Sequence, residues 1–466
     1  MSKGAKAGRQ GSARLILSLR WRWFFLPDDH PGRCSHFTND KLSKTITLTI
    51  MKFHAPLLVT SIFLTTLHAG ETKPDAISGG TGAIGKDPFL RPAASGQTGH
   101  QITVSNKKAE VPVVVVRGTP YEMGRQLGRL IAPQMQQFVP AAVEGTSREM
   151  GVSQEKLREV WARTAAFADD RVEQEMAGLA DGSGLPLGLL QAMHAVPILK
   201  PYSCSSIAAW GPATQDGHLY QTRNLDWSLE VKAHEFPVIV VYIPDKGRAH
   251  VVPTFAGMIG AHTGMNTAGL ALSEMGDSPE REMPYQVHAP HFTVFFRTLL
   301  YDASSLTEAL QTFQALPLTK RYHYVFGDGG VDQRAVKIRA HAPEPPGKQV
   351  AIWGDNDPAD ENSPDVLPGV VFNDEGRGAF PTLKKEHGKL NAEKLVALAN
   401  SIPIKGGSVV NVVYDATALR MWVTYARGNE EAYQRPSVFL DLRTLDANKD
   451  GQPDINVPAT KTIKAE

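Results

Sequence analysis

The chain has 466 residues, a formal net charge of +1 and 42% hydrophobic residues, which is enough for one large domain or two to three smaller ones. This ordinary apolar content excludes a fibrous repeat and wholesale disorder, and two cysteines exclude a disulfide scaffold or a cysteine-rich metal site. No apolar run reaches the roughly 18 residues that span a bilayer.

The near-zero net charge hides a division between the N-terminal segment and the rest. Residues 1–50 contain nine Lys or Arg against three Asp or Glu, and residues 51–69 add one Lys. The remaining residues 70–466 therefore carry a net charge of −6. Since they contain no basic block, we expect no binding to nucleic acid.

Residues 51–69 have the pattern of a secretory signal peptide. Met51 and Lys52 give a short positive start, Ala55–Leu67 is mostly apolar, and a small residue precedes the presumed cleavage point. We therefore expect a secreted or periplasmic protein. A signal peptide has to be N-terminal, so residues 1–50 are interpreted as a non-native extension from an upstream start codon. A genuine disordered basic extension is the alternative.

The next two segments differ in composition. Residues 70–108 are rich in Gly, Pro, Ser, Thr and Lys and are expected to form a flexible leader. Residues 109–203 are predicted to be mostly helical after a β-branched strand at Val111–Val116. In the first helix, the small residues Gly124 and Gly128 indicate close packing. Further helices are predicted over residues 153–180 and 186–194.

From residue 201 onwards, predicted strands alternate with paired helices. The helices are expected at 291–316 and 392–401, and the strands at 204–211, 218–227, 236–243, 249–255, 269–273, 335–340, 409–414 and 421–425. This alternation predicts an α+β fold of stacked helix and sheet layers.

A C-terminal tail over residues 441–466 contains an Asp-rich loop. Asp446–Asp454 has the D-x-N-x-D-G-x-x-D spacing of a calcium loop, but Val457 stands where the bidentate Glu belongs. A plain Asx-rich turn is the favoured interpretation. Calcium binding stays open.

Cys204 would be the single cysteine of an exported chain, because Cys34 lies in the removed segment. An unpaired thiol is unusual in an oxidising compartment. The count alone leaves two alternatives: a reactive thiol or a small buried hydrophobic side chain.

The segment that begins C-S-S-I-A-A-W-G and ends R-N-L-D-W at residues 223–227 decides between them. It resembles the nucleophile segment of the isopenicillin N acyltransferase-like family, and of the related choloylglycine hydrolases, penicillin V acylases and acid ceramidases. All are N-terminal nucleophile (Ntn) cysteine hydrolases. The resemblance extends upstream to R-G-T-P-Y-E-M-G-R-Q-L-G and downstream to G-M-N-T-A-G-L-A-L and V-V-Y-D-A-T-A-L-R-M-W-V, over roughly residues 110–440.

The resemblance implies a four-layer αββα sandwich with a helical N-terminal region, made as a zymogen. Residues 109–203 would belong to the light chain and residues 204–440 to the heavy chain. The precursor would cut itself before Cys204 and act as a hydrolase or acyltransferase on the linear amide bond of N-acyl compounds. Penicillin-, bile-salt- and N-acyl-amine-like substrates all stay open, and no cofactor is implied. Its partners would be the small-molecule substrate and its own two fragments.

Such chemistry can also be built from the residues themselves. The Cys204 thiol would attack the carbonyl of Ser203, and water would open the resulting thioester. The freed α-amine has an ordinary pKa of roughly 7.7–8 and the thiol about 8.5. Because these values nearly match, the amine can act as the base without a histidine.

Two further side chains follow from the same motif. In the families resembled, the residues matching Arg223 and Asp226 lie beside the nucleophile. Arg223 would stabilise a thiolate or oxyanion, since Arg stays charged at any working pH, and Asp226 would orient the α-ammonium group. A surface salt bridge at a strand end is the alternative interpretation.

The oxyanion donor is expected from a later strand. Asn373, in G-V-V-F-N, is the best match to the family pattern, with a plain turn asparagine as the alternative. A second donor is expected from a backbone N–H near Glu274–Gly276, where bile salt hydrolases tend to have Asn. Those hydrolases also keep a late arginine; Arg420 is a candidate that the sequence alone cannot place.

Two rival interpretations remain. A non-catalytic exported binding protein that retains the Ntn fold is the main alternative. A papain-like peptidase would need a helix that starts at the cysteine and a partner His. The strand-like C-S-S-I-A-A-W segment does not offer such a helix.

Overall fold

The computed structural model describes residues 99–106, 109–200, 202–276, 285–341, 349–355, 357–360, 364–374, 376, 378–403 and 406–444. The expected extension 1–50, the expected signal peptide 51–69 and the Asp446–Asp454 loop lie outside the described residues, as does most of the expected leader. Among the described residues, no helix combines the length and apolar character that crossing a bilayer requires.

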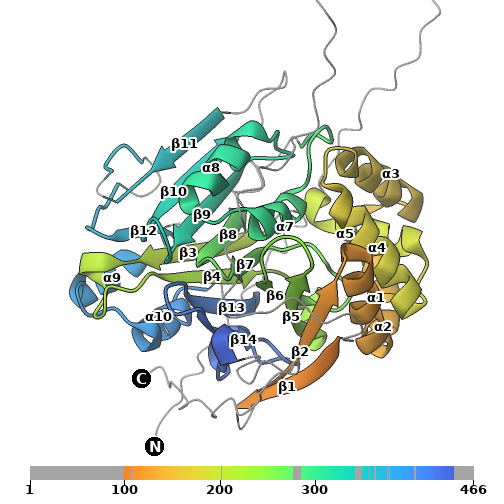
Figure 1. Ribbon diagram of the computed structural model, residues 1–466, viewed down its shortest axis with the longest axis horizontal. Helices are drawn as coiled ribbons and strands as arrows, with labels where there is room; N and C mark the ends of the chain where they lie inside the picture. Colours follow the sequence, from red (N-terminus) through yellow and green to blue (C-terminus); the bar gives the residue numbers. More distant parts are fainter. Residues whose placement is uncertain are drawn as a thin grey trace, which may run out of the picture. The chain divides into compact units, whose positions relative to one another are not determined.

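Two β-sheets form the centre of the described fold (Figure 1). The larger has nine strands in the order β1-β2-β5-β6-β7-β8-β9-β10-β11, and its neighbours are antiparallel except for the parallel pair β2–β5. The strands are β1 His100–Asn106, β2 Ala109–Gly118, β5 Pro237–Pro244, β6 His250–Phe255, β7 Thr263–Asn266, β8 Leu270–Gly276, β9 Tyr322–Asp328, β10 Arg334–His341 and β11 Gln349–Trp353.

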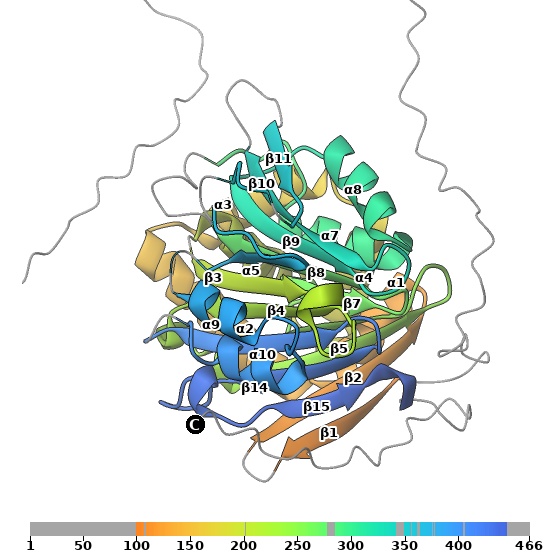
Figure 2. The same cartoon turned by 90° about the vertical axis from the view of Figure 1, so that its left-hand side faces the viewer.

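The smaller sheet has six antiparallel strands in the order β12-β3-β4-β13-β14-β15. These are β12 Val370–Asn373, β3 Ser203–Ala209, β4 Tyr220–Asp226, β13 Ser408–Asp415, β14 Arg420–Tyr425 and β15 Val438–Asp441. The side chain of Gln221 on β4 links the two sheets. Its Nε2 donates to Ser273 Oγ at 2.8 Å and to Val325 O at 3.0 Å, both on the nine-stranded sheet. The sheets therefore pack face to face, as Figure 2 shows.

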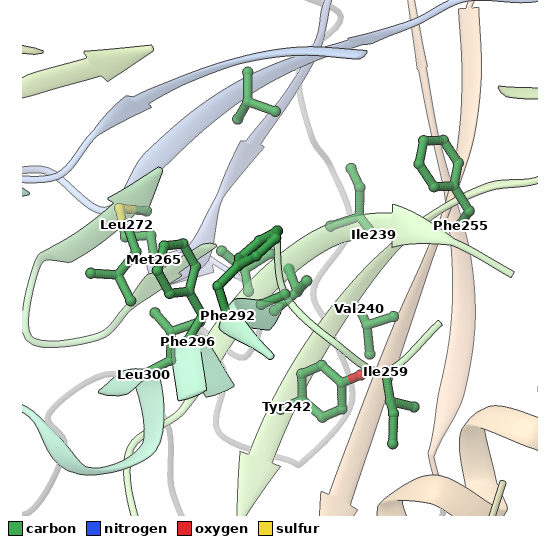
Figure 3. Packing of buried hydrophobic residues seen from close by; sticks show 14 of the residues in the cluster. Ile239, Val240, Tyr242, Phe255, Ile259, Met265, Leu272, Phe292, Phe296 and Leu300 are labelled. Atoms are coloured by element: carbon green, nitrogen blue, oxygen red, sulfur yellow. The ribbon is translucent and has the colours of Figure 1, made fainter. Parts of the chain in front are cut away.

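Helices cover the outer face of each sheet. On the nine-stranded sheet lie α7 Phe292–Asp302 and α8 Leu306–Ala315, with Phe296 and Leu300 beside Met265 and Leu272 (Figure 3). On the six-stranded sheet lie α9 Ala379–Glu386 and α10 Ala392–Ala399, over a second apolar cluster that includes Ile207 and Phe372. This arrangement confirms the four-layer αββα fold predicted from the sequence.

Five helices occupy the stretch between β2 and β3, where a helical region was predicted. They are α1 Pro120–Leu130, α2 Ala132–Met150, α3 Gln154–Ala165, α4 Asp170–Ser183 and α5 Leu187–Leu199. Helix α1 begins with a capping box in which Thr119 and Glu122 satisfy each other's backbone N–H groups. The close helix packing predicted from Gly124 and Gly128 is observed between α1 and α4. A Cβ on Gly124 would lie 2.0 Å from the carbonyl oxygen of Glu175.

The structure corrects the sequence interpretation in three places. Residues 100–106, expected in the flexible leader, form strand β1, because the chain pairs with β2 and buries Val104. The helix predicted over 153–180 is two helices, since the side chain of Asp169 caps a new start at α4. The helix predicted over 291–316 is also two, because Ser305 caps α8.

Candidate active site

Cys204 is the second residue of β3 and lies in the middle of the molecule. It pairs with Leu225 of β4, its side chain is fully buried, and it forms no disulfide. Arg223 of β4 donates from Nη2 to the Cys204 sulfur at 3.2 Å. The cation expected beside the thiol is therefore in hydrogen-bond contact with it.

The sheet register explains this contact and brings in Asn373. Side chains two residues apart on a strand share a face, and residues paired across strands share it too. Cys204 and Arg223 therefore project from the same face of the six-stranded sheet, the one that packs on the other sheet. Asn373 of β12 pairs with Ser206, which places it on this face, one diagonal step from Cys204. In a regular sheet, such diagonal neighbours lie about 7–8 Å apart, with their Cβ atoms somewhat closer.

Asp226 occupies a different position from Arg223. It is paired with Ser203, the residue whose carbonyl precedes Cys204, and with Ser408 on its other side. An odd spacing of three residues puts Arg223 and Asp226 on opposite faces of β4. Arg223 thus lies beside the sulfur, whereas Asp226 lies level with the Ser203–Cys204 peptide bond. This is where a carboxylate would meet the amine that cleavage of this bond creates.

The surroundings hold the Cys204 thiol in its protonated form. Burial raises the pKa of the Cys204 thiol well above its usual range, and the carboxylates of Glu274 and Asp226 raise it further. Arg223 and a hydrogen bond from the backbone N–H of Gly276 act in the opposite direction and lower it. The thiol therefore needs a base to become a nucleophile, and a free α-amine on the same residue would be one.

The N–H of Gly276 is a backbone donor within the range 274–276, where a second oxyanion donor was expected. It ends strand β8 and points at the sulfur from the opposite sheet. The Gly276 N–H from the nine-stranded sheet and the Asn373 amide from the six-stranded sheet would flank a tetrahedral intermediate on Cys204.

Glu274 is a site residue that the sequence interpretation did not assign. Its buried carboxylate lies 3.7 Å from Arg223 Nη2 and accepts a hydrogen bond of 2.9 Å from the Tyr202 hydroxyl. Because it comes from the nine-stranded sheet, only the stacking of the two sheets brings it to the cysteine. The R-N-L-D-W motif gives no signal for it.

Arg223 has more donors than the described residues use. Its Nε and Nη1 atoms are buried and make no hydrogen bond to any described residue. A buried guanidinium usually has all of its donors paired, since each unpaired donor costs free energy. The spare donors therefore suit a carbonyl oxygen of a ligand.

An apolar pocket opens beside Arg223. It encloses about 570 Å³ including its open mouth and is formed by α5, the ends of β4 and β6, and the start of α7. Its lining is mostly apolar and includes Met193, Val196, Leu225, Trp227, Phe255, Met258, His262 and Phe292. Lys200 also lines the pocket, and its ammonium group is paired with Glu149. Burial lowers the pKa of His262 well below its usual value, so this ring is neutral. The pocket suits an uncharged apolar group next to Arg223.

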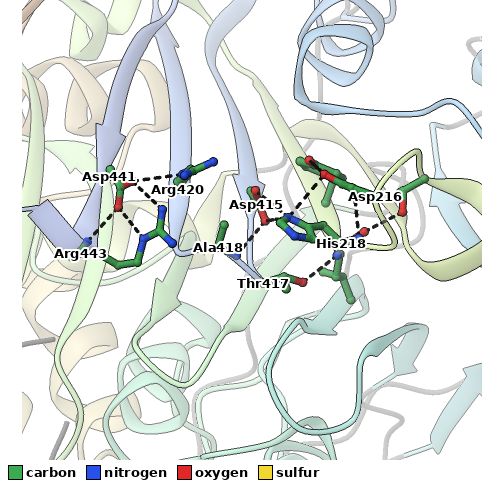
Figure 4. Close-up of polar contacts among 11 residues, drawn as sticks. Asp216, His218, Asp415, Thr417, Ala418, Arg420, Asp441 and Arg443 are labelled. Carbon is green, nitrogen blue, oxygen red and sulfur yellow. Dashed lines mark hydrogen bonds and ion pairs between the residues drawn. The ribbon is translucent and has the colours of Figure 1, made fainter. Parts of the chain in front are cut away.

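The structure places Arg420 away from this site. It stands at the start of β14, where it pairs with Asp415 and, through Nε, donates to Asp441 at 3.1 Å (Figure 4). Asp415 itself pairs with Tyr220, at the end of β4 opposite to Asp226. Within the described residues, no group of three or more His, Cys, Asp or Glu could hold a metal ion.

Part of the chain matches known proteins. Residues 213–345 match the family described as acyl-coenzyme A:6-aminopenicillanic acid acyl-transferase, a range that starts after Cys204 and contains Arg223, Asp226 and Glu274. Protein dcd1B of Dictyostelium discoideum is 29% identical over 264 residues, which cover 50% of this chain and 51% of that protein. An uncharacterized protein of Archaeoglobus fulgidus is 24% identical over 244 residues, with 46% and 40% covered. The chain spans about half the length, or less, of the curated relatives it matches.

Three solved structures are also similar. They are a Caenorhabditis elegans N-acylethanolamine-hydrolyzing acid amidase ortholog (16% identity, 51% of this chain and 100% of that chain, TM-score 0.37), a conjugated bile acid hydrolase mutant from Clostridium perfringens (13%, 51% and 92%, 0.33) and a penicillin V acylase from Agrobacterium tumefaciens (12%, 51% and 91%, 0.33). The match of residues 213–345 to the acyl-transferase family model confirms the resemblance recognised in the segment that follows Cys204.

Proposed function

We propose that the protein is an Ntn cysteine amidohydrolase or acyltransferase that acts on the linear amide bond of N-acyl compounds with an apolar acyl group. The observation that carries this proposal is the 3.2 Å contact between Arg223 Nη2 and the Cys204 sulfur, at the wall of an apolar pocket. The proposal covers hydrolysis, in which water takes the acyl group, and transfer, in which an amine takes it.

Activation would begin in the uncut chain. The Cys204 thiol attacks the carbonyl carbon of Ser203, the Ser203–Cys204 amide becomes a thioester, and the α-nitrogen of Cys204 takes up the proton. Water then opens the thioester, which leaves the Ser203 carboxylate and regenerates the thiol. Asp226, paired with Ser203, is placed to accept a hydrogen bond from the new α-ammonium group.

Turnover would use the thiol and the amine together. The α-amine takes the thiol proton, the sulfur attacks the substrate carbonyl, and Gly276 N–H and the Asn373 amide donate to the oxyanion. The α-ammonium then protonates the leaving amine, and a thioester on Cys204 remains. Water or a second amine, deprotonated by the same α-amine, releases the acyl group. The pocket beside Arg223 would hold the apolar acyl group during these steps.

Processing gives the first test. The full chain is purified, and its fragments are measured by intact mass and N-terminal sequencing. We expect a fragment that begins at Cys204, and a single uncut chain for Cys204→Ala. Cys34→Ala is the matched control and should be cut normally. An uncut wild-type chain would instead support the alternative, a binding protein that retains the Ntn fold. Equal cutting of Cys204→Ala would mean that another protease is responsible.

Amine release gives the second test. The processed protein is incubated with aminocoumarin amides of decanoic, phenoxyacetic, acetic and glutaric acid, and the free amine is followed by fluorescence. The decanoyl and phenoxyacetyl amides should be cleaved faster than the acetyl and the negatively charged glutaryl amides, because the pocket is apolar. If none of the four amides released amine, the proposed activity would be contradicted.

Export is a separate proposal that rests on the signal-like segment 51–69. If Met51 is the true start, deleting residues 1–50 should leave export and activity unchanged or improved. Fractionation of cells that make each form would measure this. Loss of soluble protein on deletion would contradict the interpretation of residues 1–50 as non-native.

A further inference from the structure

Asn373 lies on β12, a strand that is hydrogen-bonded to its own sheet along one side only. Strand β12 has four residues and lies at the edge of the six-stranded sheet, where it pairs with β3 alone. A short edge strand has unpaired backbone groups along its outer side and is easily displaced. An oxyanion donor, by contrast, has to be held within a few tenths of an ångström. Something outside the sheet therefore has to fix β12.

Lys337 of β10 makes that connection from the opposite sheet. Its Nζ donates to the carbonyl oxygen of Phe372 at 3.0 Å, one residue before Asn373. Lys337 pairs with Val325, whose neighbours Tyr324 and Phe326 pack against Phe296 of α7. By alternation, Val325 and Lys337 therefore project from the other face, toward the six-stranded sheet. The side chain is buried. The contact therefore fastens the backbone of β12 on its open side.

The carboxylates of Asp360 and Asp374 add to the contact between Lys337 and Phe372. These three contacts together are called the clamp. Asp360, itself buried, forms an ion pair with Lys337 Nζ and so fixes the ammonium group in place. Asp374 follows Asn373 and accepts hydrogen bonds from Gly376 N at 3.0 Å and Ala379 N at 2.7 Å, which ties the chain to the start of α9. Asn373 is thus held from the residue before it and from the residue after it.

We propose that Lys337 is a positioning residue that holds β12 so that the Asn373 amide meets the oxyanion formed on Cys204. This inference rests on the proposed function of the site. A buried ion pair contributes little net stability compared with an apolar replacement of similar size. An apolar side chain could not donate a hydrogen bond to the Phe372 carbonyl oxygen, so it could not hold this oxygen in one position.

Lys337 keeps its charge at neutral pH. Burial lowers the pKa of Lys337 to about 8, while the nearby carboxylates of Asp374 and Asp357 work against this decrease. The ammonium form therefore prevails below pH 8 and is lost above it. A small void lined by Trp353, Asp357 and Asp365 adjoins the lysine.

The test compares Lys337→Met, Lys337→Arg and Asn373→Ala in the processed protein, with decanoyl-aminocoumarin as substrate. Lys337→Met should lower kcat at least tenfold and change KM less than twofold, because it acts after substrate is bound. Lys337→Arg should restore most of kcat and extend activity above pH 8, since Arg stays charged. Lys394→Met, which removes a surface lysine paired with Glu386, is the matched control and should act like wild type.

A double-mutant cycle separates positioning from a general loss of stability. If Lys337 acts through Asn373, adding Lys337→Met to Asn373→Ala should lower kcat by less than twofold further. A full additional tenfold loss would show that Lys337 does not act through Asn373. Wild-type kcat in Lys337→Met, with an inactive Asn373→Ala, would overturn the positioning role and leave the proposed function standing. Full activity of Asn373→Ala would instead overturn the assigned oxyanion role, and the Lys337 proposal with it.

If Lys337→Met does not fold, Asp360→Asn replaces it in the same cycle. This change removes the carboxylate charge that fixes the lysine and keeps the shape of the side chain. It should lower kcat severalfold in the wild-type background and have no further effect with Asn373→Ala. Unchanged kcat in a folded Asp360→Asn protein would count against the clamp.

Discussion

The contact between α1 and α4 allows a stability prediction whose size follows from the coordinates. Gly124 is buried in α1, and a Cβ there would lie 2.0 Å from the backbone oxygen of Glu175 and 3.0 Å from the nitrogen of Leu179. Ordinary van der Waals contact begins at 3.4 Å. Gly124→Ala therefore forces the two helices more than about 1 Å apart, because backbone atoms cannot rotate out of the way.

Two opposite effects determine the free energy change. Alanine in a helix interior is favoured over glycine by about 0.5–1 kcal/mol, and overpacking a tight contact costs about 1–3 kcal/mol or more. At Gly124 the overpacking should win, with a net loss of about 1–2 kcal/mol or more. Gly145 in α2 is the matched control, since a Cβ there meets nothing within 4 Å. Gly145→Ala should stabilise the protein by about 0.5–1 kcal/mol.

Urea unfolding, followed by circular dichroism, would measure both changes. All proteins carry Cys204→Ala, so that every sample is expected to be one uncut chain. The midpoint should fall for Gly124→Ala and rise for Gly145→Ala, with unchanged slopes. If the two variants unfold at the same urea concentration, the close contact between α1 and α4 does not exist in solution.

Three further predictions concern the site and its surroundings. Asp226→Asn and Arg223→Lys should each keep the fold but lose most of the amine release. Asp226→Asn removes the charged acceptor for the α-ammonium group, and Arg223→Lys removes the planar cation beside the thiol. Full activity in both variants would mean that these residues are structural. Glu274→Gln should lower the pKa of the Cys204 thiol, since the Glu274 carboxylate raises that pKa. The pH dependence of iodoacetamide alkylation would measure this in processed protein that carries Cys34→Ala, and an unchanged profile would contradict it. Burial lowers the pKa of His194 to about 4, below its ordinary value of 6.5, so stability should be intact above pH 6.5 and fall by up to about 3 kcal/mol as the pH drops to 4. His194→Gln should flatten this slope in urea unfolding at several pH values, and an equally steep slope would refute the assignment.

The sequence predicted the strands that carry Cys204 and Arg223, but not their register. The Gly-containing turns that separate the strand-like segments are enough to place β3 and β4. Register depends on which backbone groups pair across the sheet, and a shift of one residue would turn Arg223 away from the sulfur. The family motif supplied this missing information, because its spacing carries the register with it.

Elements that depend on distant partners were the ones missed. Strand β1 lies in a segment whose composition is typical of a leader, so it has no clear local signal. The four-residue strand β12 was expected only through the family pattern around Asn373. Glu274 was noted only as a departure from the bile salt hydrolases. Its role depends on the stacking of two sheets, which no local pattern in the sequence reveals.

The position of Cys204 near the start of β3 suits a chain that is to be cut there. In the proposed cleavage, the bond between Ser203 and Cys204 breaks, and only the pairing of Ser203 with Asp226 is released from the ladder. The remaining strand stays between β4 and β12, paired with both. A cysteine in the middle of β3 would instead have cost half of these backbone hydrogen bonds on cleavage. The new amine would also appear at a free strand end, next to the strand position of Asp226, so the pairing that holds the bond before the cut would also orient the base after it.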